Sequence, residues 1–327
     1  MKAVFYTASR QLELRDAAEP SAKTGEAVVA VDAVGICGSD MHAWLGHDPR
    51  RVPPLILGHE IAGRAGGNGD SSGGARVAVN PLVTCGACAH CKSGRGNLCA
   101  KRELLGMRLP GGFAECVAVA EKNLLPVPPA LSTVQAALCE PLAVCVHALA
   151  RAADAGGGAV DGGHALVIGG GAIGLLSALL LCSAGVEVCI AETNQLRRAV
   201  LEKADCGAVV AGATGQNQFS LVVDAVGSAA TRAIAVRAAA GGGVVVHVGL
   251  ADNDGGLDTR KMTLEEIAFI GVYAYTEADF AAALGKLAAG ALGGLEWVET
   301  RPLADAPQTF AEIHAGKCAA PKVVLLP

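Results

Sequence analysis

Four cysteines that lie close together in the sequence could bind a metal ion. They follow the pattern C-x2-C-x2-C-x7-C within a span of fifteen residues, at Cys85, Cys88, Cys91 and Cys99. Four thiolates complete a tetrahedral zinc site and leave no position for a substrate. The pattern therefore predicts a structural zinc ion, with His90 as an exposed residue of the same lobe rather than a ligand.

A second set of ligand types is spaced more loosely. Cys37 lies in Gly-Ile-Cys-Gly-Ser-Asp-Met-His, and Gly-His-Glu places His59 22 residues after Cys37, with Glu60 directly following. A thiolate, an imidazole and a carboxylate can hold zinc and leave one coordination position open, where the ion polarises an alcohol or carbonyl oxygen. Glu140, in Cys-Glu-Pro, supplies a further carboxylate. On spacing alone, scattered polar loop residues remain the alternative interpretation.

A third motif predicts a dinucleotide site. Residues 167–174 read as a strand that runs into G-x-G-x-x-G and then into a helix, whose free N–H groups suit a pyrophosphate. Glu192 ends the next strand, 18 residues beyond Gly174, where a carboxylate would accept hydrogen bonds from the ribose and favour NAD over NADP. The alternative is a surface glutamate, and Arg197 or Arg198 could soften the preference. The predicted contacts are Gly169, Gly171, Ala172, Ile173, Gly174, Glu192 and Arg197.

Two kinds of element must position these residues. Valine-rich runs at 26–31, 75–79 and 113–119, separated by Gly/Pro turns, predict a β-rich, barrel-like first domain. A helix over 133–151 leads out of it, and the segment after residue 164 alternates strands with helices, which predicts a doubly wound parallel sheet. Its strands are expected at 164–168, 186–191, 221–225, 244–248 and 267–272, and its helices at 172–184, 195–204 and 229–240. After residue 275 we expect two helices and a closing strand, 322–326, that returns to the first domain; 66–74 is predicted as a glycine-rich turn.

Composition narrows the function classes. Of 327 residues, 52% are apolar and 17% are charged, and the net charge is −5. Such a chain is not intrinsically disordered and has no basic surface for nucleic acid or anionic membrane. The most apolar stretch, 173–184, is shorter than the ~20 residues that span a bilayer, so we expect a soluble cytoplasmic protein. The remaining cysteines are predicted in the core: Cys116, Cys139, Cys145, Cys182, Cys189, Cys206 and Cys318.

Taken in order, these motifs resemble those of the zinc-containing medium-chain alcohol dehydrogenases. The match includes Pro-Leu-Ile-Leu-Gly-His-Glu, Cys-Glu-Pro-Leu-Ala-Val and Gly-Gly-Gly-Ala-Ile-Gly, and it covers essentially the whole chain. It is most similar to the polyol branch, since Glu140 stands where liver-type enzymes have a cysteine ligand. The resemblance implies an α/β protein with a chaperonin-10-like catalytic domain, residues 1–147 and 275–327, and a Rossmann NAD-binding domain, residues 148–274.

The resemblance also implies roles for individual residues. Cys37 and His59 would bind the catalytic zinc, with Glu60 as a direct ligand and Glu140 as a direct or water-bridged one. Asp40 would orient His59. Ser39 would receive the substrate proton and His42 would deliver it to solvent. In the loop that follows, we expect contact with the substrate at Trp44, His47 and Arg50, with an exposed loop as the alternative.

The predicted function is reversible, zinc-dependent transfer of a hydride from a secondary alcohol, a polyol or sugar alcohol, to NAD, with two zinc ions per chain. One alternative is a threonine, other amino-alcohol or butanediol dehydrogenase. Another is a non-catalytic NAD- and zinc-binding protein, which the complete set of catalytic residue types argues against. The expected partners are a small alcohol and further copies of the chain, as a dimer or tetramer, without nucleic acid or membrane.

Overall fold

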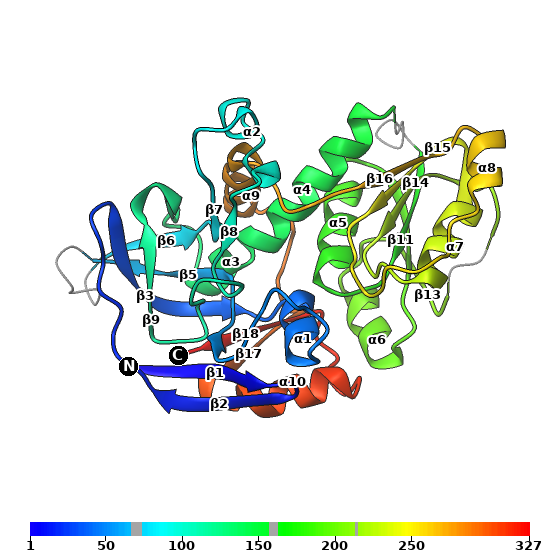
Figure 1. Cartoon of the computed structure of the whole chain (residues 1–327). Coiled ribbons are helices and arrows are strands. Elements are labelled where there is room, and N and C mark those ends of the chain that lie inside the picture. The colour runs from blue at the N-terminus through cyan, green and yellow to red at the C-terminus, as the bar shows by residue number, and fades with distance from the viewer. Residues whose placement is uncertain (67–73, 157–162, 213–214) are drawn as a thin grey trace.

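The computed structural model describes residues 1–66, 74–156, 163–212 and 215–327, which form a β-rich unit and an α/β unit side by side (Figure 1). The predicted turn at 66–74 falls mostly outside these residues. The strands of the β-rich unit are β1 (Lys2–Ala8), β2 (Gln11–Asp16), β3 (Glu26–Gly35), β4 (Leu55–Ile56), β5 (Glu60–Ala65), β6 (Ala75–Val79), β7 (Leu82–Val83), β8 (Glu103–Leu104), β9 (Cys116–Ala120), β10 (Leu124–Pro126), β17 (Val298–Pro302) and β18 (Lys322–Leu326). Its helices are α1 (Gly38–Trp44), α2 (Ala89–Lys92), α3 (Thr133–Ala137), α9 (Glu277–Ala288) and α10 (Ala306–His314).

The α/β unit is a six-stranded parallel sheet with the order β13-β12-β11-β14-β15-β16, which confirms the predicted doubly wound fold. Its strands are β11 (His164–Ile168), β12 (Glu187–Ala191), β13 (Ala208–Val210), β14 (Phe219–Asp224), β15 (Ala239–His247) and β16 (Ala268–Gly271). Its helices are α5 (Ala172–Ser183), α6 (Gln195–Lys203), α7 (Ala229–Ala238) and α8 (Thr259–Leu264), and α4 (Cys139–Asp154) joins the two units.

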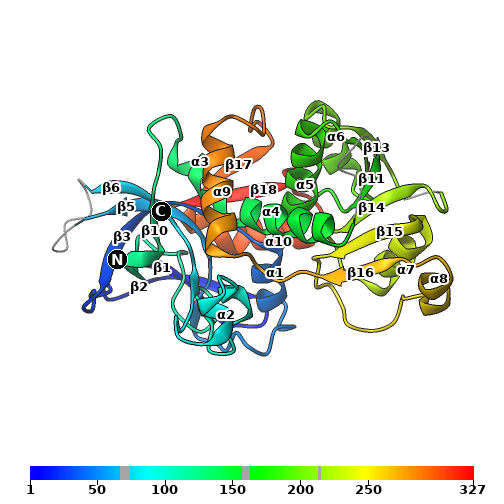
Figure 2. The ribbon, with the colours of Figure 1, turned by 90° about the horizontal axis from the view of Figure 1, so that it is seen from above.

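The strands of this sheet are apolar on both faces because helices cover both. Along β11, Val167 packs into one cluster with Leu175 and Leu176 of α5, whereas Leu166 and Ile168 pack into another with residues of α7. Successive side chains on a strand point to opposite faces, so a sheet between two helical layers needs a nearly continuous run of Val, Ile and Leu. Figure 2, seen from above, shows α4 and α5 lying along the sheet.

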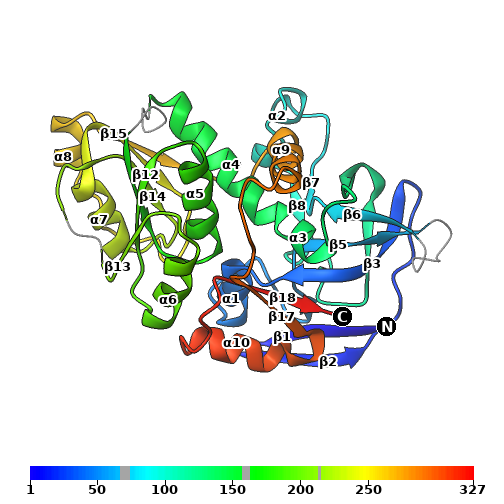
Figure 3. The same cartoon turned by 180° about the vertical axis from the view of Figure 1, so that it is seen from behind.

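The end of the chain completes the β-rich unit. Strand β18 pairs with β3, with Val324 opposite Gly35, and β17 pairs with β18. The six strands β10-β6-β5-β3-β18-β17 lie in one sheet, and β9 also pairs with β3. Figure 3 shows β17 and β18 beside the N-terminal strands. This pairing supports the predicted domain division, 1–147 with 275–327 and 148–274, which we retain as a proposal.

Several elements differ from the predictions. The helix expected over 133–151 is two helices, α3 and α4, which meet at Leu138. Pro141, in the first turn of α4, has no N–H to donate to Ala137, and its ring would collide with that carbonyl in a continuous helix. The short elements β13, α8 and β17 were not predicted. Within the described residues, no helix is both long and apolar enough to cross a membrane.

Candidate metal and nucleotide site

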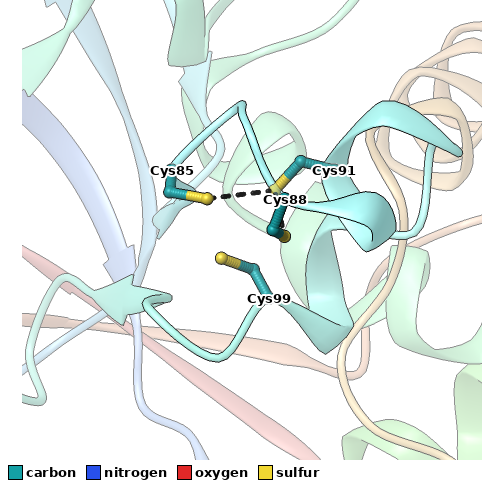
Figure 4. Close-up of side chains that lie close together, drawn as sticks. All are labelled: Cys85, Cys88, Cys91 and Cys99. Atoms are coloured by element: carbon teal, nitrogen blue, oxygen red, sulfur yellow. Dashed lines mark hydrogen bonds between the residues drawn. The ribbon is translucent and has the colours of Figure 1, made fainter.

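The four clustered cysteines converge on one point in the lobe that contains α2. Their sulfur atoms face a common centre (Figure 4) and all lie within 4.8 Å of one another. The Sγ atoms of Cys88 and Cys91 are 3.4 Å apart, and those of Cys85 and Cys91 are 3.8 Å apart. With Zn–S bonds of about 2.3 Å, a regular tetrahedron has edges of about 3.8 Å. The four thiols therefore fit a zinc ion, and His90 lies exposed on the same lobe as predicted.

The second ligand set lies where the β-rich unit meets the α/β unit. Cys37 is the residue before α1, His59 precedes β5, and Glu60 is the first residue of β5; their donor atoms also lie within 4.8 Å of one another. Gly35, the last residue of β3, pairs with Glu60 across the strands. A Cβ atom at Gly35 would overlap Oε2 of Glu60, so only glycine leaves room for this carboxylate.

Asp40 connects the two ligand segments. Its Oδ2 accepts a hydrogen bond from the Cys37 backbone N–H at 3.0 Å, and its Oδ1 lies 3.4 Å from Nδ1 of His59. In the described part of the chain, both Oδ1 of Asp40 and Nδ1 of His59 are buried without a hydrogen-bond partner. Burial alone would lower the pKa of His59, but the charges of Asp40 and Cys37 outweigh it and raise that pKa well above its usual value. Negative charge that would hold a proton at His59 can hold a cation there instead, so the donor set fits zinc.

Lys322 was not predicted, yet it contacts the carboxylate of Glu60. Its Nζ donates to Oε1 and Oε2 of Glu60 at 2.6 and 2.7 Å and to the carbonyl oxygen of Ile36 at 2.8 Å. Both side chains of this ion pair are almost fully buried. The pKa of the nearby Glu140 is raised to about 7, chiefly by burial; the charge of His59 opposes the shift and that of Glu60 adds to it. The available sequence signal was a lysine that opens an otherwise apolar strand, Lys-Val-Val-Leu-Leu.

Ser39 and His42, the predicted relay residues, lie three positions apart on α1, and both line the same cavity as the ligand set. The Ser39 Oγ is 3.5 Å from Nε2 of His59 and accepts a hydrogen bond from Nη2 of Arg51 at 3.1 Å. Arg51 is buried and was not predicted. Burial, the largest effect, lowers the pKa of His42.

Of the three residues expected to contact the substrate in and after α1, one lines the cavity. Arg50 lines the cavity, whereas Trp44 and His47 do not. Trp44 is buried in the core, where its ring packs edge-to-face on Phe310 with centroids 6.1 Å apart. Its contribution is therefore to packing under α1.

The glycine motif takes the expected strand–turn–helix form. Gly169 has φ +94°, and α5 begins at Ala172. A Cβ atom at Gly174 would overlap the carbonyl oxygen of Gly169, so glycine allows the helix to pack closely on the strand. Gly171, Ala172, Ile173 and Gly174 line one cavity of about 380 Å³ together with Cys37, His59, Glu60 and Glu140.

Glu192 lies beneath this turn. It is buried, its Oε2 accepts from the Gly170 backbone N–H at 2.9 Å, and its Oε1 accepts from the Asn194 N–H at 2.7 Å. The two arginines differ in position. Arg197 Nη1 is 3.6 Å from Oε2 of Glu192 and the residue lines the cavity, whereas Arg198 donates to backbone carbonyl oxygens.

Of the cysteines predicted in the core, Cys139, Cys145, Cys206 and Cys318 are buried, while Cys116, Cys182 and Cys189 are only partly buried. Burial raises the pKa of the Cys145 thiol to about 12, so this group stays protonated at neutral pH. The buried thiols therefore act as small packing groups.

Comparison with known proteins matches both halves of the chain to family models. Residues 23–129 match the alcohol dehydrogenase GroES-like domain, and residues 172–289 match the zinc-binding dehydrogenase family. The chain is 35% identical to L-galactonate-5-dehydrogenase of Escherichia coli over 279 residues, which covers 81% of this chain and 80% of that one. It is 28% identical to D-arabitol-phosphate dehydrogenase of Enterococcus avium over 94% of this chain and 92% of that one.

A solved structure is similar over the whole length. A protein of Sinorhizobium meliloti, described as a zinc-binding dehydrogenase and bound to NADP, superposes with a TM-score of 0.86 at 29% identity, covering 100% of this chain and 99% of that one.

Proposed function

The chain belongs to the zinc-containing medium-chain alcohol dehydrogenases, which oxidise CH–OH groups with NAD(P), and on this basis we propose that it reversibly oxidises a secondary alcohol of a polyol or sugar alcohol with NAD. The observation that carries the proposal is the shared cavity. The Cys37, His59 and Glu60 donors and the glycine turn at Gly171–Gly174 line one space, so an alcohol at the ligand set and a nicotinamide held by the turn would meet.

We assign the open zinc site to Cys37, His59 and Glu60, with Glu140 as a further carboxylate beside them. Zinc, when bound, supplies positive charge that eases loss of the alcohol proton, and NAD accepts the hydride. Lys322 neutralises Glu60 within the buried site, while Asp40 orients His59.

We assign to Ser39 the role of taking the alcohol proton. Its Oγ already accepts a hydrogen bond from the Arg51 guanidinium, so the Ser39 hydroxyl hydrogen points away from Arg51, and negative charge that develops on Oγ is stabilised. His42 lies one helical turn further on the same face of α1 and passes the proton toward solvent.

The proposed preference for NAD over NADP rests on Glu192. Its carboxylate lies at the end of β12 beside the glycine turn, where it would accept hydrogen bonds from ribose hydroxyls and repel a 2′-phosphate. Arg197, which lines the cavity near Glu192, is the residue that would weaken this preference; Arg198 is held by backbone contacts.

The proposed assembly is a homo-oligomer. Strand β16 is the last strand of the parallel sheet, and its partly buried Phe269 and Ile270 are apolar. Pairing with β16 of a second copy would satisfy the backbone groups of this edge. Light scattering on the purified protein should give a mass of two or four chains. We place the enzyme in the cytoplasm, where reducing conditions keep the four lobe cysteines from forming disulfides and so available to bind zinc.

A turnover screen tests the proposed reaction. Zinc-replete protein is incubated with NAD and a panel of polyols, diols, amino alcohols and simple alcohols, and NADH is followed by absorbance. We expect turnover with polyols and loss of turnover in Cys37→Ser. Cys116→Ser is the matched control, because Cys116 is partly buried in β9 and belongs to neither metal set. Formation of no NADH from any alcohol would instead favour the non-catalytic binding protein.

A further inference from the structure

A cluster of three charged side chains borders the cavity beside Ser39. Asp48 accepts hydrogen bonds from Nε and Nη2 of Arg50 at 2.8 and 3.0 Å and from Nη1 of Arg51 at 2.7 Å. Two guanidinium groups therefore share one carboxylate. Burial on its own would raise the pKa of Asp48, but its hydrogen bonds to Arg50 and the charges of both arginines lower it to about 2. The carboxylate is ionised at neutral pH, and the cluster has one positive charge in excess.

Arg51 is not available to a ligand. Its side chain has no exposed surface, and its guanidinium donates to Asp48, to the carbonyl oxygen of Gly106 at 2.9 Å and to Ser39. All three nitrogens of this group are thus in use. Its contacts stabilise the loop and the Ser39 hydroxyl.

Arg50 is the accessible member of the cluster. Its side chain is 42% exposed and lines the cavity together with Ser39, Met107 and Tyr273. Among the described residues its side chain donates only to Asp48, through Nε and one N–H of Nη2, so Nη1 and the second N–H of Nη2 have no acceptor there and remain free to bind a ligand. Two parallel N–H groups of one guanidinium match the two oxygens of a carboxylate or phosphate.

The other charged residues described in the cavity do not neutralise the excess positive charge of the cluster that contains Arg50. Lys322 is neutralised by Glu60, and Arg197 lies beside Glu192 at the nucleotide end. Glu60 and Glu140 lie with the metal donors rather than with Arg50. A neutral polyol offers Arg50 only hydroxyl groups, whereas an anionic end group offers it a charge-assisted pair of hydrogen bonds.

We propose that Arg50 binds a terminal oxyanion, a carboxylate or a phosphate monoester, on the polyol that this enzyme oxidises. The inference rests on the proposed function and narrows its substrate class to acidic polyols. The anionic end lies against Arg50, and the reacting hydroxyl lies at Cys37 and Ser39 in the same cavity. Arg50 acts as a specificity-determining residue and takes no part in proton transfer.

The experiment compares matched pairs of probes with zinc-replete enzyme and NAD. Sorbitol, galactitol and mannitol are each tested against the corresponding hexonate and hexitol 1-phosphate, so that the carboxylate and phosphate arms are separate. We expect kcat/KM for at least one anion to exceed that of its neutral hexitol at least tenfold, which corresponds to about 1.4 kcal/mol. Arg50→Gln should lower kcat/KM for that anion by a factor at least tenfold greater than the factor by which it lowers kcat/KM for the neutral hexitol.

Two further variants sharpen the test. Arg50→Lys keeps the positive charge but cannot form the bidentate pair of hydrogen bonds, and it should retain part of the preference for the anionic substrate. Arg151→Gln is the matched control, since Arg151 is 41% exposed and also pairs with a nearby aspartate, Asp154, but lies outside the cavity. Its kinetic constants should equal those of the wild type.

The outcomes separate this inference from the proposed function. Three results would each overturn the role of Arg50 while polyol oxidation stands. The enzyme could oxidise neutral hexitols as well as it oxidises their acids. The Arg50→Gln variant could keep the preference for the anion, or it could weaken NAD binding instead. If no probe is oxidised, the proposed function fails. Calorimetric titration of the hexonates and hexitol phosphates into NADH-loaded protein then decides the subsite. Binding that Arg50→Gln abolishes supports the subsite, and absent or unchanged binding refutes it.

Discussion

Removal of the ammonium group of Lys322 should destabilise the protein strongly. Lys322→Met keeps most of the aliphatic volume but takes away the partner of the Glu60 carboxylate, whose two oxygens lie 2.6 and 2.7 Å from Nζ. The exposed fractions of the two side chains are 2% and 0%, so water cannot replace the lost contact. The carbonyl oxygen of Ile36 loses a hydrogen bond as well.

The size of the effect follows from this burial. Breaking a buried ion pair on one side costs about 3–5 kcal/mol, because an uncompensated charge remains inside the protein. For domains of this size, 1 kcal/mol shifts the unfolding midpoint by about 2–4 °C, so we expect a drop of roughly 6–20 °C. Zinc bound near Glu60 would supply part of the missing positive charge. The loss should therefore be larger in chelator-treated than in zinc-replete protein.

Scanning calorimetry of both forms provides the measurement. The double variant Lys322→Met/Glu60→Gln should recover most of the lost stability, because it removes the orphaned charge as well. The exposed pair between Lys2 and Asp16 provides the control, and Lys2→Met should leave the unfolding midpoint almost unchanged, because solvent screens such a pair. A Lys322→Met protein as stable as the control would show that the folded state does not need the buried ion pair. A double variant without recovery would show that an orphaned Glu60 charge is not the cause of the loss.

Four further results are expected. Elemental analysis should find two zinc ions per chain. Cys85→Ser should lose one of them, and Cys37→Ala should lose the other together with turnover. A zinc content that these substitutions leave unchanged would refute the ligand sets. Ser39→Ala should keep zinc and NAD binding but lower kcat and alter its pH profile, and an unaltered profile would exclude the relay. Wild type should prefer NAD to NADP by at least about tenfold in kcat/KM, and Glu192→Ala should narrow this ratio; a ratio that the substitution leaves unchanged would rule out Glu192 as its source. Because the pKa of Asp48 is lowered to about 2, its contribution to stability is present above its unfolded pKa near 3.8 and is lost as pH falls through about 2. Asp48→Asn should therefore flatten the acid side of the stability profile, measured by urea unfolding between pH 7 and 2, and a profile that the substitution leaves unchanged would contradict this.

Local motifs proved the most informative part of the sequence. The four lobe cysteines lie within a single loop region, so their spacing alone nearly determines how their sulfur atoms can meet. The glycine motif is similar, because turn geometry and helix packing depend on neighbours within eight residues of the chain. The alternation of strands and helices likewise predicted the parallel sheet, since burial on both faces requires continuous apolar strands.

Contacts between segments that are distant in the sequence could not be predicted from such local motifs. Hydrophobic runs indicated that 322–326 is a strand, but nothing local indicated that Lys322 meets Glu60, 262 positions away. Nor did the sequence distinguish Arg51, a buried donor to Ser39, from its neighbour Arg50, which lines the cavity. A charged residue next to apolar ones is compatible with either environment until its partners are known.

The sequence by itself therefore determined the two metal-ligand sets as candidates, the nucleotide turn and the fold class, because each depends on residue types at short, regular spacing. Only the tertiary structure brought Cys37, His59 and the glycine turn around one cavity, and only it supplied Lys322 as the partner of Glu60. The physical reason is that ion pairs and cavities form between chain segments whose separation carries no periodic signal. Their geometry follows from the pairing of β18 with β3 and from the packing of α4 between the two units.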